Sequence, residues 1–410
     1  MHRLSHNQRL SELQTITQPM TISTTLWFVY RGMIYCGISG LLMTALPHFR
    51  LHKRALQLYW LMNLLVMGTW YVSQFSAQNW LVASAPLRWI VALWLNANMA
   101  YAAAGMGFLL LSLLLKICRR KLHSLFWRKP NRLLIPLVCI LSVAGVYEAM
   151  TPPVLRHFDV YPDQLPSALD GMKIAQITDS HVGDFVSSAE LASAVDRLNA
   201  EKPDLLVMTG DLLDDERQLT SAFAALAQAN APLGVVAILG NHEKYQGLTA
   251  ILQKYQSAAA SSQIRLLVDE KMNLSYRGTA FQIVGVDYPI LPDSRRKLAE
   301  TAQMDYMQRS AEKAFRHVTP DEWLLCLTHH PDFFDLATAR NTNLSLAGHT
   351  HGGQVIPLGY TVGTLWSKYI KGWFQRQQSQ LYVSTGMGHV WPYRLGVPTE
   401  IVTFTLHAKK

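Results

Sequence analysis

Aspartate, histidine and asparagine gather in five short clusters between residues 179 and 352 of this 410-residue chain. The clusters are Asp179-Ser180-His181, Gly210-Asp211-Leu212-Leu213-Asp214, Gly240-Asn241-His242-Glu243, His329-His330-Pro331 and Gly348-His349-Thr350-His351-Gly352. Carboxylate oxygen, amide oxygen and imidazole nitrogen together suit Mn, Fe or Zn, whereas an all-oxygen set would suit Mg or Ca. The five clusters therefore predict a site for one of the first three metals.

The spacing inside the clusters favours ligation. Residues two apart in extended chain point the same way, so Asp179 and His181 can grip one ion. The glycines let the backbone turn sharply and approach a metal, because a positive φ costs them little. A single His or Asp in a loop is more often structural than catalytic, so the inference rests on the joint pattern.

Each cluster comes just after a stretch that is predicted to be a β-strand. The expected strands are 172–178, 205–209, 235–239, 281–286, 324–328, 344–347, 381–384 and 401–406, with helices at 188–200 and 220–230. Such alternation indicates an α/β domain with helices on both faces of its sheets. Ligands in open α/β sheets gather at the carboxyl ends of the strands, where these clusters lie.

The series D-x-H, G-D-x-x-D, G-N-H-E, H and G-H-x-H resembles the calcineurin-like metallophosphoesterase superfamily. All five blocks occur in the family's order across about residues 172–352. The run 382–388 and the stretch 398–401 also resemble bacterial membrane-associated members, which include hydrolases of sugar-nucleotide pyrophosphates in lipid synthesis. The resemblance implies a four-layer αββα sandwich and an active phosphoric ester hydrolase.

The resemblance also implies two divalent metal ions. One is expected to bind Asp179, His181 and His351, and the other Asn241, His329 and His349. Asp211 is expected to bridge the two ions and to count as catalytic. His242 is expected to stay off the metals and to protonate the leaving oxygen or steady the phosphoryl group.

Three neighbouring positions leave alternatives open. Either His329 or His330 could be the ligand, and the family's spacing to Pro331 favours His329. Asp214 and Glu243 could hold ligands through hydrogen bonds or could merely cap helices.

Two metals about 3.5–4 Å apart can lower the pKa of a shared water and neutralise charge on the phosphoryl oxygens. We therefore expect a metal-activated hydroxide to hydrolyse a phosphodiester or pyrophosphate bond without a protein nucleophile. In agreement, the sequence has no convincing Ser-His-Asp or Cys-His signature and no Walker-type phosphate loop.

The first 150 residues differ in kind, with four apolar stretches at 25–47, 55–75, 89–117 and 133–150. A helix needs about 20 mainly apolar residues to cross a bilayer, so we expect about four transmembrane helices in residues 1–150. A buried bundle in a soluble protein is the alternative, although soluble helices rarely stay apolar all round. Thr151-Pro152-Pro153 should end the last helix, which makes 151–410 the hydrolase domain.

Charge separates the two halves as well. Residues 1–150 hold 14 Lys and Arg against 2 acidic residues, whereas residues 151–410 hold 23 against 26. Lys and Arg are retained on the cytoplasmic side, and here they concentrate after the first and third apolar stretches. This predicts a multi-pass protein of the bacterial plasma membrane with its catalytic domain outside the cytoplasm, although Arg3, Arg9 and Arg31 argue mildly against it.

Residues 360–376 interleave aromatic and basic side chains directly after the last metal cluster. Trp and Tyr favour membrane interfaces and Lys and Arg suit anionic head groups, so this segment could contact the bilayer or a lipid-linked phosphate. A helix that packs on the core with a solvated edge explains it equally well.

Three other functions agree less well with the sequence. A receptor or transporter with a binding-only domain would predict charged residues inside the spanning segments, where Arg31 is the main one. A nuclease is opposed by the acidic balance of the second half, so no nucleic-acid partner is expected. An inactive scaffold is disfavoured because every motif position is kept, and the oligomeric state stays open.

Overall fold

The computed structural model describes residues 24–46, 49–76, 80–117, 131–245, 248–261, 264–291, 298–320, 322–356, 358–365 and 367–409. These residues form two compact units. One contains the residues up to Met150 together with Trp391–Arg394, and the other contains Thr151–Val390 and the residues from Leu395 onward.

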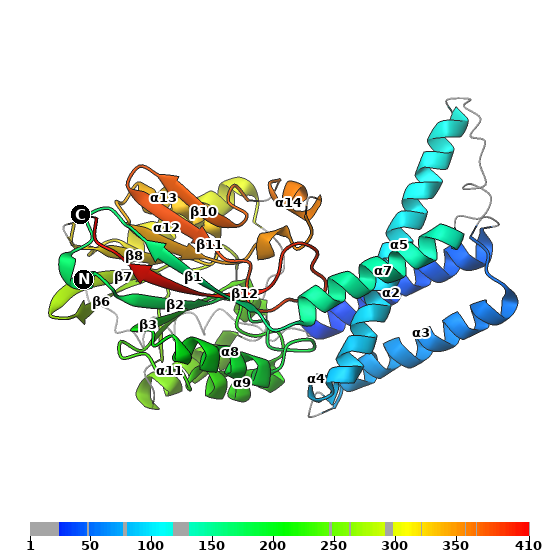
Figure 1. The fold of residues 1–410 in the computed structure, drawn as a ribbon, viewed down its shortest axis with the longest axis horizontal. Coiled ribbons are helices and arrows are strands. Elements are labelled where there is room, and N and C mark those ends of the chain that lie inside the picture. The colour runs from blue at the N-terminus through cyan, green and yellow to red at the C-terminus, as the bar shows by residue number, and fades with distance from the viewer. Residues whose placement is uncertain are drawn as a thin grey trace. The chain divides into compact units, whose positions relative to one another are not determined.

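Helices make up most of the described part of the first unit. Its helices are α2 (Thr24–Ala45), α3 (Lys53–Ser73), α4 (Trp80–Ala83), α5 (Ala85–Ile117) and α7 (Asn131–Met150) (Figure 1). Helices thus occupy all four stretches that the sequence predicts. Helix α5 begins four residues earlier than expected and therefore includes Arg88.

Three of the described helices are long and apolar enough to cross a membrane, as judged by length and composition. The spans are Phe28–Ala45 in α2, Ala85–Ile117 and Asn131–Met150. Helix α3 is not among them, although it matches the second predicted stretch. Hydrogen bonds satisfy polar groups between the helices, as where the Tyr59 hydroxyl donates to Asn98 Oδ1 at 2.6 Å.

The second unit is built on two six-stranded sheets. The strands of the first run in the order β1-β12-β2-β3-β4-β5, and those of the second in the order β10-β11-β9-β8-β7-β6. The first sheet contains β1 (Val154–Val160), β12 (Glu400–Leu406), β2 (Lys173–Ile177), β3 (Leu205–Thr209), β4 (Val235–Ile238) and β5 (Ile264–Leu266). The second contains β10 (Gly372–Arg376), β11 (Ser379–Val383), β9 (Leu344–Ala347), β8 (Leu324–Leu327), β7 (Thr279–Gly285) and β6 (Glu270–Tyr276).

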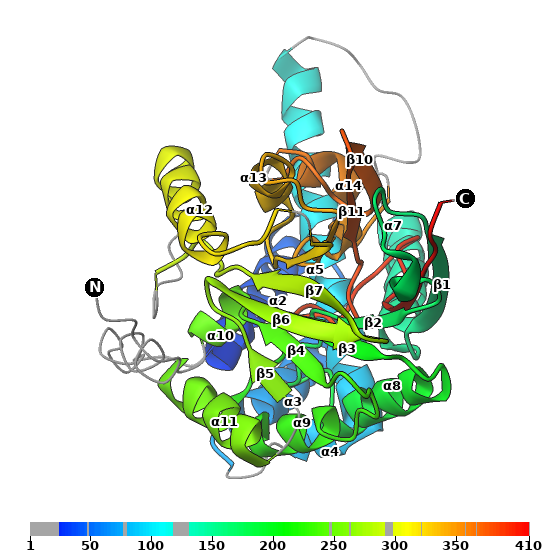
Figure 2. The same cartoon turned by 90° about the vertical axis from the view of Figure 1, so that its left-hand side faces the viewer.

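Helices cover the outer face of each sheet, which makes four layers. The first sheet is covered by α8 (Ser188–Ala200), α9 (Leu219–Leu226) and α11 (Leu248–Ser261), which lie side by side in Figure 2. The second is covered by α12 (Glu300–Ala314) and α13 (Phe334–Thr338). Short helices α10 (Asn241–Tyr245) and α14 (Leu358–Gly363) complete the unit. The predicted αββα sandwich is confirmed.

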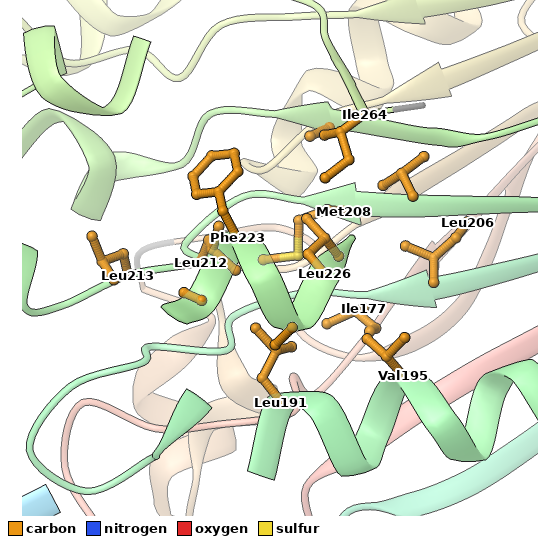
Figure 3. Packing of buried hydrophobic residues seen from close by; sticks show 14 of the residues in the cluster. Ile177, Leu191, Val195, Leu206, Met208, Leu212, Leu213, Phe223, Leu226 and Ile264 are labelled. Atoms are coloured by element: carbon orange, nitrogen blue, oxygen red, sulfur yellow. The ribbon is translucent and has the colours of Figure 1, made fainter. Parts of the chain in front are cut away.

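Apolar packing holds these layers together. Leu191 and Val195 of α8 and Phe223 and Leu226 of α9 pack on strand residues such as Met208 (Figure 3). A separate cluster fills the space between the two sheets, where Val207 of β3 meets residues such as Leu346 of β9. Burial on both faces explains why the central strands have continuous apolar sequences.

Strands β2, β3 and β4 run parallel, and so do β7, β8, β9 and β11. Parallel strands place their carboxyl ends at one edge of a sheet. The five clusters of Asp, Asn and His described above, called the metal-type clusters below, follow five of these strands. The fold therefore collects residues from widely separated parts of the chain along this edge, called the site edge below.

Candidate metal centre

Five strand ends deliver the candidate ligands, three from one sheet and two from the other. Asp179 and His181 follow β2, Asp211 follows β3, and Asn241 and His242 follow β4. In the second sheet, His329 follows β8, and His349 and His351 follow β9. The site therefore lies where the edges of both sheets meet.

The backbone at this site is held in an uncommon conformation. Asp179, His181, Asp211, His349 and His351 all have positive φ angles, between 48° and 76°. Residues other than glycine rarely adopt this region, and such strain clusters at functional sites because the surroundings impose it. Five such residues in one place indicate that the loops are shaped for a purpose beyond connecting strands.

Two glycines make the close approach of these loops feasible. A Cβ added to Gly210, whose φ is +90°, would lie 2.6 Å from Nδ1 of His329. A Cβ added to Gly348 would lie 2.2 Å from Oδ2 of Asp179. Either side chain would push a candidate ligand out of place.

The candidate ligand atoms lie close together in three overlapping groups. They are Asp179 with His181 and His351, His181 with Asp211 and His242, and Asp211 with His329 and His349, and within each group the ligand atoms lie within 4.8 Å of one another. Nε2 atoms of His181 and His351 are 3.1 Å apart, and Nε2 of His329 is 3.1 Å from Oδ2 of Asp211. Asp211 thus lies between the two sets of ligands that the sequence predicts.

The donor set fits metal ions. Oδ1 of Asn241 is buried and has no hydrogen-bond partner among the described residues. Leaving a buried amide oxygen unpaired costs about 1–3 kcal/mol, so such an atom needs an explanation. A cation bound between Asn241, His329 and His349 would supply the missing partner, and its charge would offset the burial of Asp179 and Asp211.

His329 and His330 have different surroundings. Nδ1 of His329 is 2.7 Å from the carbonyl oxygen of Thr209, which leaves Nε2 directed at Asp211. Nε2 of His330 is instead 3.1 Å from Nε2 of Gln303, and its Nδ1 accepts from the backbone N–H of Asp332. The geometry therefore favours His329 over His330 as the ligand.

Asp214 connects two of the histidines. Its Oδ1 lies 3.0 Å from Nδ1 of His181 and 2.5 Å from Nδ1 of His242, so it fixes the orientation of both rings. Burial lowers the pKa of His242, but the carboxylates of Asp214 and Asp211 outweigh this effect and raise it to about 9. Burial would raise the pKa of Asp214, yet the two histidines hold that pKa below its usual range.

Glu243 joins two of the ligand loops. Its carboxylate accepts hydrogen bonds from the backbone N–H groups of Asp211, Leu212 and Gly240 at 2.6–3.0 Å. The hydrogen bond from the backbone N–H of Gly240, three residues earlier, is also the one by which a glutamate caps the N-terminus of a helix, here α10. Glu243 therefore does both things that the sequence left open, and it fixes Asp211 relative to Asn241.

A cavity of about 290 Å³ opens beside the ligands. Asn241 and His349 line it on the side of the metal-type cluster, and Tyr245, Tyr288 and Ile370 are among its apolar lining. The cavity is a natural place for the part of a substrate that adjoins the reacting group.

Sequence reasoning missed two residues of this region. Tyr288 lines the cavity, and its hydroxyl lies 3.0 Å from Nε2 of His349. Lys244 is buried, and its Nζ donates a hydrogen bond to the carbonyl oxygen of Tyr288. The available signal for Tyr288 was its position just after a predicted strand, which it shares with the metal-type clusters.

Comparisons with known proteins agree with this geometry. Residues 172–353 match the calcineurin-like phosphoesterase family. An uncharacterised metallophosphoesterase of Bacillus subtilis is 30% identical over 59% of this chain and 81% of its own length. A metallophosphoesterase of Campylobacter jejuni is 29% identical over 71% of this chain and 74% of its length. A Bos taurus transmembrane protein with a metallophosphoesterase domain is 30% identical over 67% of this chain and 62% of its length.

Proposed function

The chain belongs to the calcineurin-like phosphoesterase family, and on that basis we propose that it is a membrane-anchored hydrolase of a phosphodiester or pyrophosphate bond. The observation that carries the proposal is the convergence of Asp179, Asp211, His329 and His349 from two sheets on one buried cluster. We assign the metal ligands as the sequence predicts them, with Mn, Fe or Zn as the expected ions.

The ions would polarise the phosphoryl group and lower the pKa of a water in the site. Asp179, His181 and His351 would hold one ion, Asn241, His329 and His349 the other, with Asp211 between them. His242 would give a proton to the leaving oxygen, because Asp214 holds its Nδ1 and thereby fixes the ring. Metal analysis of the purified chain, combined with its activity on a generic phosphodiester, tests the proposal.

We further propose that the substrate is lipid-linked and that the catalytic unit contacts the bilayer through α14 and the turn that follows it, residues 358–365. Leu358 and Val362 lie one helical turn apart in α14, and Leu365 lies in the turn after this helix. Leu358 and Leu365 are 68% and 77% exposed. Gly363 and Ile370, from the same segment, line the cavity beside the candidate ligands. The exposed apolar residues therefore belong to the same segment as two residues that line the cavity, and three of the described helices are candidate membrane spans.

The second part of the predicted interface segment does not support this role. Trp366 lies outside the described residues. Trp373 belongs to β10 and packs against Tyr382 and Phe404, with ring centroids 5.0 and 5.8 Å apart. Lys368 and Arg376 both form ion pairs with Asp335, which reduces the charge left for a head group. A strand, not a helix, occupies the end of this part, so we place the bilayer contact on residues 358–365 alone.

Replacing Leu358 and Leu365 together with Ser should lower turnover of a diacyl phosphodiester in mixed micelles by about tenfold or more, since burial of each leucine stabilises by about 1.5–3 kcal/mol. Turnover of a small soluble diester should be unchanged. Tyr161→Ser is the matched control, because Tyr161 is also exposed and lies just after β1, away from the site edge. Equal losses on both substrates would contradict the bilayer contact.

We propose that residues 1–150 are the membrane region, residues 151–410 the catalytic domain, and that this domain lies outside the cytoplasm of a bacterial cell. The resemblance to a transmembrane relative supports the membrane region. With the N-terminus outside and both basic loops inside, the outside location of the domain needs four crossings, so α3 must cross too. Its exposed Leu58, Leu61 and Leu64 are consistent with contact to lipid.

A cysteine placed at the exposed Ser275 of β6 checks this orientation. In spheroplasts, a membrane-impermeant maleimide should label Ser275→Cys without lysis, because the reagent reaches only groups outside the plasma membrane. The described native cysteines in the catalytic unit offer no competing site, since Cys326 is buried. Labelling that needs lysis would place the domain in the cytoplasm.

A nuclease and a binding-only receptor are less well supported. Residues 151–410 hold more acidic than basic side chains, and this negative net charge disfavours binding to the phosphate backbone of nucleic acid. A receptor would not need Asp214 and Glu243 to brace the ligand loops. Hydrolysis of single-stranded DNA at a rate above that of a small diester would favour the nuclease.

A further inference from the structure

Tyr288 occupies a position in the cavity that none of the metal-type clusters explains. Its side chain is almost fully buried, and its hydroxyl reaches 3.0 Å from Nε2 of His349. Its ring also lies 5.5 Å from that of His329, as measured between centroids. The phenol is therefore directed at the residues proposed to hold the second metal. Tyr288 also lines the cavity beside these residues.

A buried ion pair fixes the loop that carries Tyr288. Lys244 Nζ is fully buried and donates to Oδ2 of Asp287 at 2.7 Å and to the carbonyl oxygen of Tyr288 at 2.8 Å. It also donates to the carbonyl oxygen of Ile290 at 3.0 Å, and the Tyr306 hydroxyl donates to Asp287. Burying a charge costs free energy unless the charge is paired and hydrogen-bonded. The network satisfies this requirement for Lys244 and Asp287, and the loop that carries Tyr288 supplies part of it.

The network joins the loop to the candidate metal ligands. Lys244 belongs to α10, the same short helix that carries Asn241 and His242. Because Lys244 grips the backbone on both sides of Pro289, the loop cannot shift without moving α10. Tyr288 is thus held at a set place relative to the ligands, as substrate-contacting groups need to be.

We propose that Tyr288 contacts the substrate, donating its O–H to a non-bridging oxygen of the phosphoryl group bound in the cavity. This inference rests on the proposed function. If Nε2 of His349 ligates a metal, that atom cannot accept a hydrogen bond, and the phenol proton is then directed to whatever anion lies beside it. A neutral donor aimed at a phosphoryl oxygen stabilises charge there without adding a positive charge.

The test is Tyr288→Phe in the full-length, metal-loaded protein, with inorganic phosphate as the probe. A hydrogen bond to a charged group is worth a factor of about 10–100, so the Kd for phosphate measured by calorimetry should rise by that factor. The kcat/KM for a generic phosphodiester should fall by a similar factor. The metal content should stay equal to that of the wild type, because the phenol is not a ligand.

Tyr255→Phe is the matched control. Tyr255 is equally buried, and its hydroxyl has no partner among the described residues, so the loss of its oxygen should leave phosphate binding unchanged. An unchanged phosphate Kd in Tyr288→Phe would overturn the inference. A lower metal content, with phosphate binding restored by added metal, would also overturn it, since Tyr288 would then only orient His349.

The inference and the proposed function fail in different ways. If the wild type binds phosphate but hydrolyses no diester, the proposed function fails, while the phosphate Kd of Tyr288→Phe still decides the contact. If the wild type hydrolyses the diester and Tyr288→Phe matches it in both measurements, only the inference fails.

Discussion

Replacing Asp211 with Ala is expected to lower hydrolysis of a generic phosphodiester by about 10³-fold or more, because charge stabilisation at the phosphoryl group depends on both ions. Asp211 is buried, and its ligand atom lies within 4.8 Å of those of His181, from the first ligand set, and of His329 and His349, from the second. Its Oδ1 also accepts from the backbone N–H of His242 at 2.8 Å, so it fixes the start of α10 as well. Elemental analysis should show that the variant holds less metal than the wild type.

The matched control is Asp305→Ala, which removes an exposed carboxylate from α12. Its activity and metal content should equal those of the wild type. Circular dichroism separates loss of the site from loss of the fold, since Asp211 contributes to loop structure. A folded Asp211→Ala variant with unchanged activity would sink the mechanism.

The second large effect on activity is expected from replacing His242 with Gln. Loss of a positioned proton donor typically lowers the rate by about 10²–10⁴-fold, and we expect kcat to fall in that range for an alkyl phosphodiester. Metal content should be retained, because His242 is assigned as a proton donor and not as a ligand. The size of the loss should depend on the leaving group, since a good leaving group departs without a proton.

A nitrophenyl diester supplies that comparison. Its leaving group is weakly basic, so the loss caused by His242→Gln should be much smaller than with the alkyl diester. Equal losses on both substrates would indicate that His242 stabilises the phosphoryl charge, which is the other role that the sequence left open. His157→Gln, which changes an exposed histidine of β1, should affect neither substrate.

The central strands and helix α8 of the catalytic unit were predictable because the local sequence pattern indicates which of their residues are buried. Helix α8 has the predicted bounds, and the capping box formed by Ser187 and Glu190 explains its sharp start. The central strands β3 and β9 also match the predicted bounds, since both are buried along their whole length. Continuous apolar runs of this length indicate strands that are covered on both faces.

The missed strands are the ones that lack this pattern. Strand β10 is exposed at most of its positions, and β6 lies at the other end of the same sheet with mixed burial. Edge strands such as these are stabilised by pairing with a neighbouring strand, β11 for β10 and β7 for β6. The local sequence does not reveal this pairing. The same reason explains why residues 360–376 were read as one segment, whereas the structure divides them between α14 and β10.

The sequence by itself determined which donor atoms are available and that each cluster follows a strand, because motif and periodicity are local properties. Only the tertiary structure decided that these clusters come together from the edges of two different sheets. It also directs His329 rather than His330 at Asp211, in agreement with the family's spacing, and it alone places Tyr288 against His349. Such choices depend on the pairing and packing of residues far apart in the chain, which a linear pattern cannot specify.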